Sequence, residues 1–179
     1  MADINIDLEV LDKMITNRGE TLRKASERQP VLLVFLRHFG CTFCREALAD
    51  ISKERHLVEE LGMQIVFVHM TDDAVADRYF TRYDLDNAVH VSDPDAQFYT
   101  AFGLLRGNFN QLFGLQSWIR GFSAGVVAGH GIGSQLGDGF QMPGVFVINR
   151  GDIISSFIHK LASDRPNYLE LAKCCQVEG

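Results

Sequence analysis

Two cysteines separated by two residues are the part of this sequence best suited to chemistry. Cys41 and Cys44 form a C-x-x-C pair that follows a run of apolar residues and begins a helical pattern. Cysteines three positions apart at a helix start lie on the same side of it, close enough for their sulfurs to bridge. In a reducing compartment, such a pair indicates redox chemistry or metal binding.

The position of the pair favours a reactive thiolate. The first amide groups of a helix have no partner within the helix, and the helix dipole favours negative charge there. Because the thiolate is the nucleophile, this environment increases cysteine reactivity. Arg37, His38 and Arg45 are expected to add positive charge. We expect Cys41 to lie exposed at the helix tip and Cys44 to lie one turn in, partly covered.

Two other interpretations apply to the pair. One is that both cysteines are small apolar residues of the core. The other is a metal site, which needs two more ligands, and the candidates are His38, His130, Cys174 and Cys175. The sequence has neither a second C-x-x-C nor an H-x-x-x-H motif. Redox chemistry is therefore favoured, with no metal or cofactor, and Cys174 and Cys175 are expected to accompany a C-terminal helix.

The composition is that of an ordinary folded domain. The chain has 179 residues, 46% of them hydrophobic and 22% charged, enough to bury a substantial core. Its formal net charge of −6 argues against broad contact with nucleic acid or an anionic membrane. The apolar run at 31–36 is far too short to span a membrane. The first residues lack the features of a signal peptide, so a cytoplasmic location is expected.

Hydrophobic patterning predicts an α/β fold with a central mixed sheet flanked by helices. Strands followed by helices imply parallel pairing with right-handed crossovers. The expected strands are 31–36, 64–69, 88–92, 145–148 and 153–158, the last two forming an antiparallel hairpin. The expected helices are 42–61, 72–83, 93–102 and a final helix capped by Ser163 or Asp164 with Pro166 in its first turn. The first thirty residues favour a helix or coil and then a turn at 17–19; two short strands around that turn are the alternative.

Residues 103–141 interrupt this pattern. They contain ten of the sixteen glycines, together with Phe109, Phe113, Trp118, Phe122 and Phe140. We expect a helical, glycine- and aromatic-rich insertion within one domain spanning 1–179, because a solvated linker does not carry so many large rings. The insertion forms a lid or a homodimer face near the site, or it packs on its own sheet; the sequence leaves these alternatives open.

Pro143 immediately precedes the predicted strand at 145–148. In the thioredoxin-like layout, a cis-proline loop lies against the C-x-x-C pair and offers backbone groups to an extended substrate. The alternative is an ordinary trans-proline at the start of a strand. The combination of this proline with the C-x-x-C pair favours the cis form.

The string at 37–46, RHFGCTFCRE, resembles the AhpC/TSA-related peroxiredoxin-like proteins, including the selenoprotein L-type and peroxiredoxin-like 2-type branches. The stretches 93–103 and 143–148 fit the same family, so the resemblance covers roughly residues 10–175. It implies a thioredoxin-like fold with an insertion before the penultimate strand. It also implies redox chemistry at the C-x-x-C pair.

The chain departs from the peroxiredoxin pattern at two positions. Peroxiredoxins carry a T-x-x-C motif whose cysteine attacks peroxide; by resemblance that cysteine falls on Cys44 and the threonine on Cys41. The position of their catalytic arginine is occupied by Pro143. Arg37 and Arg120 are the candidates to supply that charge electrostatically.

These observations lead to three functional hypotheses. In the first, Cys41 attacks a substrate disulfide, Cys44 resolves the mixed disulfide, and a thioredoxin- or glutathione-type reductant restores the dithiol. In the second, Cys44 reduces hydrogen peroxide or an alkyl hydroperoxide and forms a sulfenate, which Cys41 resolves. In the third, the chain is a non-catalytic redox-sensing or binding module that uses the insertion as its interface.

Overall fold

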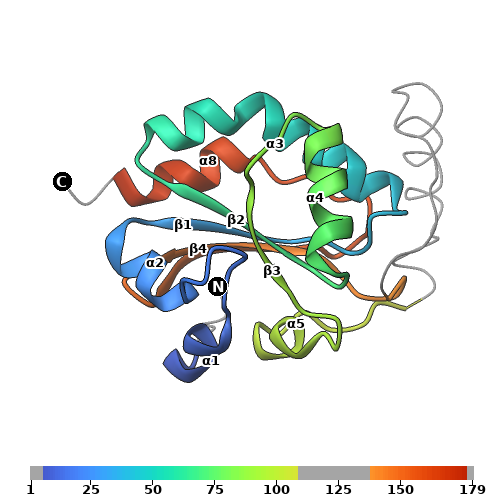
Figure 1. Ribbon diagram of the computed structural model, residues 1–179, viewed down its shortest axis with the longest axis horizontal. Coiled ribbons are helices and arrows are strands. Elements are labelled where there is room, and N and C mark those ends of the chain that lie inside the picture. The colour runs from blue at the N-terminus through green and yellow to red at the C-terminus, as the bar shows by residue number, and fades with distance from the viewer. Residues whose placement is uncertain (1–5, 109–137, 177–179) are drawn as a thin grey trace.

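A five-stranded mixed sheet lies between two groups of helices in the computed structural model, which describes residues 6–108 and 138–176 (Figure 1). Most of the predicted insertion, with Arg120 and His130, lies outside the described residues. The strand order is β3-β2-β1-β4-β5. The strands are β1 Val31–Phe35, β2 Gln64–His69, β3 Val89–Ser92, β4 Gly144–Asn149 and β5 Asp152–Ile158. The mixed α/β architecture predicted from the sequence is therefore confirmed.

The pairing of the strands follows their connections. Strands β1, β2 and β3 are parallel and are joined through helices, whereas β4 runs antiparallel to both β1 and β5. The hairpin between β4 and β5 turns through Arg150 and Gly151, both with positive φ. A left-handed backbone at these two positions suits the tight turn that the sequence predicts. β1 is the central strand, and its carboxyl end leads toward the cysteine pair.

Both faces of the sheet are covered. Helices α3, α4 and α8 pack on one face, and α1, α2 and α5 pack on the other (Figure 1). Strand β1 is apolar throughout because alternate side chains enter the two opposite core layers. The helices are α1 Leu8–Lys13, α2 Leu22–Arg28, α3 Thr42–Glu60, α4 Asp73–Arg82, α5 Gln97–Ala101 and α8 Tyr168–Lys173, followed by the 3-10 turn η2 Cys174–Gln176.

The N-terminal region contains elements of both sequence interpretations. Helix α1 precedes the turn, and a single antiparallel bridge joins Ile15 to Thr21 around it. Helix α2 then follows, which the sequence analysis missed. The Thr21 side chain accepts a hydrogen bond from the Lys24 amide and starts this helix.

Two predicted helix starts are wrong. Helix α5 begins only at Gln97, because the Asp93 carboxylate turns back to accept hydrogen bonds from the amides of Gln97 and Phe98. The final helix is capped by Asn167 rather than by Ser163 or Asp164, so Pro166 precedes it. Asp164 instead accepts hydrogen bonds from the amides of Lys160 and Leu161 and closes a turn after β5.

Candidate active site

The end of β1 holds the loop that carries the candidate site. The Tyr99 hydroxyl lies between the carbonyl oxygens of Leu36 and Val68 and shares its single proton between them, with 3.0 Å to Val68. This interaction links Leu36, the residue after β1, to Val68 of β2. Helix α3 begins at Thr42, with Cys41 as its N-cap residue. Cys41 and Cys44 therefore occupy the first turn of a 19-residue helix, as the sequence predicts.

Arg37 contacts both sulfurs. Its backbone N–H donates to Cys44 Sγ at 3.2 Å, and its Nη1 donates to Cys41 Sγ at 3.2 Å. A third donor, Nη2, reaches the carbonyl oxygen of Gly139. The residue is only 6% exposed, and its Nε has no hydrogen-bond partner.

The two cysteines, neither of which is in a disulfide, differ in their pKa values. The pKa of Cys41 is lowered to about 6, chiefly by a hydrogen bond from the Cys44 thiol, then by the charge of Arg37 and by first-turn amides, against the opposing effect of burial. The pKa of Cys44 is raised well above its ordinary value by burial and by its interaction with Cys41. At neutral pH, Cys41 is a thiolate and Cys44 remains a thiol.

The exposure expected for Cys41 is wrong, since both cysteines are buried and Cys41 is only 7% exposed. The charge expected from His38 is also wrong. Burial, followed by the charges of Arg37 and Arg45, lowers the His38 pKa to about 4, so its ring is neutral at neutral pH. Its Nδ1 is buried without a hydrogen-bond partner.

Arg45 shapes the loop that precedes the helix. Its Nε donates to the carbonyl oxygen of Phe39 at 2.9 Å, and its guanidinium lies 5.8 Å from the centre of the Tyr79 ring. The Phe39 ring stacks on Tyr79 with centroids 4.6 Å apart. Arg45 thus fixes the loop between β1 and α3.

Pro143 is in the trans form, because no peptide bond in the described residues is cis. The cis form predicted from the sequence is wrong. The chain passes from Pro143 directly into β4, where Gly144 already pairs with Phe35. A trans-proline suits this extended entry into a strand. Pro143 nevertheless lines the same pocket as Cys44.

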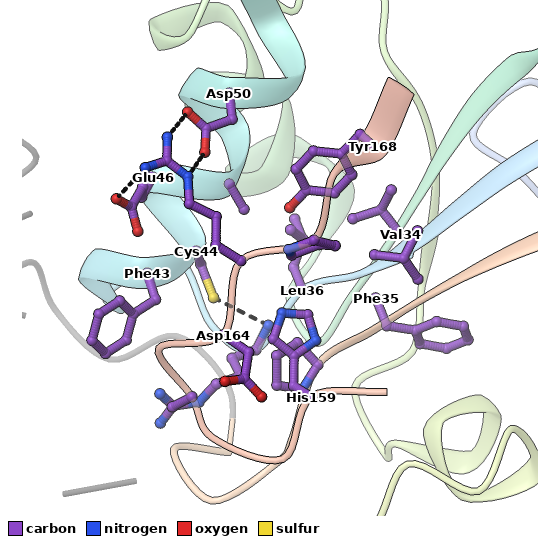
Figure 2. Close-up of a pocket in the computed structure, with 17 residues that line it drawn as sticks. Val34, Phe35, Leu36, Phe43, Cys44, Glu46, Asp50, His159, Asp164 and Tyr168 are labelled. Atoms are coloured by element: carbon purple, nitrogen blue, oxygen red, sulfur yellow. Dashed lines mark hydrogen bonds and ion pairs between the residues drawn. The ribbon is translucent and has the colours of Figure 1, made fainter. Parts of the chain in front are cut away.

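The pocket beside the pair opens on Cys44 and not on Cys41 (Figure 2). It encloses about 450 Å³, counting its open mouth. At its edge, Arg165 bridges Glu46 at 3.3 Å and Asp50 at 2.6 Å. Its walls are mainly apolar and include Leu36, Phe43, Pro143, Val145, Ala162 and Tyr168.

Among the pocket residues that sequence analysis missed are His159 and Arg165. His159 is buried, which lowers its pKa to about 4, and its Nδ1 has no hydrogen-bond partner. Both residues come from the segment between β5 and α8, more than a hundred positions after Cys44. No local spacing in the sequence connects them to the cysteine pair.

Cys174 and Cys175, two of the candidates for metal ligation, lie apart from the pair. Cys174 and Cys175 follow α8 and pack, partly buried, with Leu171 against the core. His130 lies outside the described residues. Figure 1 shows α8 running away from the start of α3.

A group of possible metal ligands in the described residues consists of His69, Asp73 and His90, all within 4.8 Å of one another. A linear chain of hydrogen bonds runs through the two histidines, and Asp73 lies 3.5 Å from His90 Nδ1. The amide of Thr71 donates to His69 Nδ1 at 3.4 Å, so His69 carries its proton on Nε2 and donates to His90 Nδ1 at 2.9 Å. His90 Nε2 then donates to Asp77 at 3.1 Å. These bonds account for two buried histidines without a metal.

The buried His69 is expected to make the fold sensitive to acid. Burial, followed by the neighbouring His90, lowers the His69 pKa to about 3 from 6.5. Below about pH 6.5 the unfolded chain therefore binds a proton at His69 that the folded chain does not bind. The contribution of neutral His69 to the free energy of unfolding is complete above pH 6.5 and is lost as the pH falls. At pH 5 the loss from His69 is about 2 kcal/mol. The buried His38 and His159, whose pKa values are also lowered, act in the same direction, so thermal unfolding of the parent at pH 7.5 and pH 5 measures the combined loss.

A matched pair of variants tests this origin. His69→Gln keeps an amide that donates to His90 and should reduce the loss of stability at pH 5. His56→Gln, at an exposed position on α3, should leave it unchanged. Equal acid sensitivity in the parent and in His69→Gln would contradict the prediction.

Comparison with known proteins shows the family of this chain. The sequence model of the AhpC/TSA family matches residues 6–156. The chain belongs to the AhpC/TSA family. It is 25% identical over 181 residues to peroxiredoxin-like 2A from Homo sapiens, covering 97% of this chain and 73% of that protein. It is 26% identical over 174 residues to prostamide/prostaglandin F synthase from Bos taurus, covering 95% and 84% respectively.

Solved peroxiredoxins share the fold of this AhpC/TSA protein. A cysteine-to-serine mutant of peroxiredoxin 6 from Arenicola marina matches with a TM-score of 0.64 at 10% identity, covering 91% of this chain and 67% of that one. Peroxiredoxin Q from Xanthomonas campestris matches with a TM-score of 0.62 at 14% identity, covering 96% and 90%. The predicted thioredoxin-like fold and peroxiredoxin-like family are thereby confirmed.

Family membership and the adjacent cysteines identify a peroxiredoxin-like thiol redox protein. In the part of the chain that the structure describes, no helix is both long and apolar enough to cross a membrane.

Proposed function

We propose that this AhpC/TSA protein is a thiol-dependent oxidoreductase that cycles Cys41 and Cys44 between a dithiol and a disulfide. The observation that carries the proposal is the contact of Arg37 with both sulfurs: its side chain donates to Cys41 and its backbone N–H donates to Cys44. Cys41 is a thiolate held by Arg37, and Cys44 is a buried thiol. One sulfur is therefore prepared to attack and the other to resolve.

The cycle begins when the Cys41 thiolate attacks a substrate disulfide. A bond forms between Cys41 Sγ and one substrate sulfur, and the other substrate sulfur leaves as a thiolate. Cys44 then loses its proton to that leaving group and attacks Cys41 Sγ, which releases the second substrate thiolate. The substrate has gained two electrons, and a Cys41–Cys44 bridge remains. A thioredoxin- or glutathione-type reductant restores the dithiol.

Peroxide reduction through Cys44 is the second candidate, favoured by the pocket that opens on this sulfur. It requires the shared proton to move from Cys44 to Cys41. The Cys44 thiolate then attacks the peroxide, an alcohol or water leaves, and Cys44 becomes a sulfenic acid. The Cys41 thiol condenses with it, water is lost, and the same bridge forms. The named peroxiredoxins among the similar structures also favour this route.

The remaining residues of the sequence prediction have supporting roles in this proposal. Arg37 stabilises the thiolate, Arg45 fixes the loop, and Pro143 forms part of the pocket wall. His38 remains neutral beside Arg37. We assign the protein to a reducing, cytoplasmic compartment, where the dithiol is maintained.

Trapping the first adduct tests the proposal. Cys44→Ser should capture a small aromatic disulfide on Cys41, because the resolving thiol is missing. Mass spectrometry after proteolysis should locate one added thiol on Cys41. In a parallel challenge with hydrogen peroxide, Cys41→Ser should show a sulfenate on Cys44 if the second route operates.

Two outcomes would contradict the proposed roles. An adduct on Cys44 in the Cys41→Ser variant, with none on Cys41 in Cys44→Ser, would reverse the attacking and resolving positions. A dithiol that remains reduced under both challenges would favour the non-catalytic module. Cys174→Ser is the control, since that cysteine packs beside the core.

A further inference from the structure

Arg37 is a buried cation that donates to sulfur from its guanidinium. Its Nη1 lies 3.2 Å from Cys41 Sγ, while its Nη2 donates to the carbonyl oxygen of Gly139. Only 6% of the residue is exposed. A buried charge is costly unless an opposite charge and hydrogen bonds compensate it. The partner of Arg37 therefore affects the stability of both the dithiol and the disulfide form.

No carboxylate forms an ion pair with Arg37 within residues 6–108 and 138–176. The segment 109–137 contains no Asp or Glu in its sequence. The nearby Asp138 is paired with Arg106 at 2.7 Å. Among the described residues, the Cys41 thiolate is therefore the anion in contact with this guanidinium.

Formation of the Cys41–Cys44 disulfide removes that anion. A disulfide sulfur is neutral and a much weaker hydrogen-bond acceptor than a thiolate. Arg37 then stays buried with a carbonyl and a neutral sulfur as neighbours, and its Nε has no partner in the dithiol state. The reduced protein retains a stabilising contact that the oxidised protein lacks.

We propose that Arg37 sets the redox equilibrium of this pair by stabilising the dithiol over the disulfide, which makes the bridge a ready electron acceptor. The inference rests on the proposed cycle of Cys41 and Cys44. It assigns Arg37 as a positioning residue that acts through the Cys41 sulfur. It also specifies the class of electron donor, because a bridge that is easily reduced can accept electrons from a simple monothiol such as glutathione.

The balanced reaction consumes two glutathione thiols. The first attacks Cys41 or Cys44 and opens the bridge to a mixed disulfide; the second attacks the glutathione sulfur and releases glutathione disulfide. Cys41 leaves as a thiolate beside Arg37, Cys44 takes up one proton, and one proton enters the solvent. The lowered pKa of Cys41 acts in the same direction, because a stabilised thiolate leaves more easily.

Equilibration with glutathione buffers tests the proposal. The parent and Arg37→Gln are incubated at pH 7.5 with a series of ratios of glutathione to its disulfide, quenched with acid, and alkylated. Mass spectrometry then gives the fractions of dithiol and bridge. Arg37→Gln should favour the bridge by about 10- to 100-fold, the usual effect of losing a hydrogen bond to a charged group. A tenfold change corresponds to about 30 mV.

Two further variants separate electrostatics from structural damage. Arg37→Lys keeps the charge but loses the planar fork, so its equilibrium should lie between those of the parent and Arg37→Gln. Arg55→Gln removes a cation that is paired with Glu59 farther along α3 and should match the parent within about twofold. Absorbance of the thiolate at about 240 nm, titrated from pH 4 to 9, should show a raised Cys41 pKa in Arg37→Gln.

An unchanged glutathione equilibrium in a folded Arg37→Gln variant would overturn the inference, even if that variant were less stable. This failure is distinct from failure of the proposed function. Trapping on Cys41 would still support the cycle when the equilibrium does not move. A bridge that forms and equilibrates without any trapped adduct would support the role of Arg37 and contradict the cycle.

Discussion

Replacing Cys41 with serine is expected to slow the reduction of a small disulfide by about a thousandfold or more, because a neutral hydroxyl is a far weaker nucleophile than a thiolate. The Cys41 thiolate is stabilised by the Cys44 thiol, Arg37 and first-turn amides, and serine at position 41 has no comparable charge. Stopped-flow release of a coloured thiol from an aromatic disulfide measures the first step directly.

Cys44→Ser should behave differently in the same assay. Its first step remains because Cys41 is intact, so about one equivalent of thiol is released before turnover stops. Serine keeps a hydroxyl donor at position 44, so the Cys41 pKa should stay lowered and the burst at pH 6 should be close to that of the parent. Cys174→Ser should match the parent. A full first-step rate in Cys41→Ser would refute this assignment of roles.

Replacing Phe35 with alanine is expected to destabilise the fold by about 3–5 kcal/mol, the usual cost of truncating a fully buried phenylalanine. Its ring is in contact with three others, at centroid distances of 4.9 Å to Tyr99, 4.9 Å to Phe102 and 5.7 Å to Phe146. Truncation leaves a cavity between β1, β4 and α5. Urea unfolding followed by fluorescence and circular dichroism measures the change.

Phe140→Ala is the matched control, because this ring is 43% exposed and lies near Arg106 at 5.7 Å. Its cost should stay below about 1 kcal/mol. Phe35→Leu, which keeps most of the volume, provides a measurable variant if the alanine protein does not fold; it should cost less than Phe35→Ala. Similar losses in the free energy of unfolding for Phe35→Ala and Phe140→Ala would contradict the assignment of Phe35 as a main contributor to the core.

The sequence was most informative where one physical pattern dominates. Strand β1 consists of consecutive apolar residues because it is buried on both faces, and α3 shows a helical stripe because one side of it packs on the sheet. These two elements determine where the cysteine pair lies. The position of the cysteine pair at a strand–helix junction was therefore predictable.

Burial and charge within the loop were not predictable in the same way. The sequence places His38 beside Arg37 but does not show that burial keeps the His38 ring neutral. It likewise does not show that Arg37 turns inward to reach both sulfurs while Arg45 turns toward Phe39. Such orientations depend on packing against elements distant in sequence.

The turns and the pocket were likewise not predictable from the sequence. Both Asp93 and Asp164 have side chains suited to helix capping, yet Asp93 spans a longer turn and Asp164 closes a loop. His159 reaches the Cys44 pocket only because β5 pairs with β4 and returns the chain to this edge. Each depends on tertiary pairing rather than on local sequence.

Arg37 donates hydrogen bonds to the two sulfurs from two independent groups. Its backbone amide donates to Cys44, and its side chain donates to Cys41. Substitution at position 37 changes the second contact but retains the backbone donor for the first. Protein engineering can therefore adjust the leaving ability of one sulfur without removing the amide that orients the other. A graded series at this single position would turn the protein into a set of redox catalysts with different driving forces and a common scaffold.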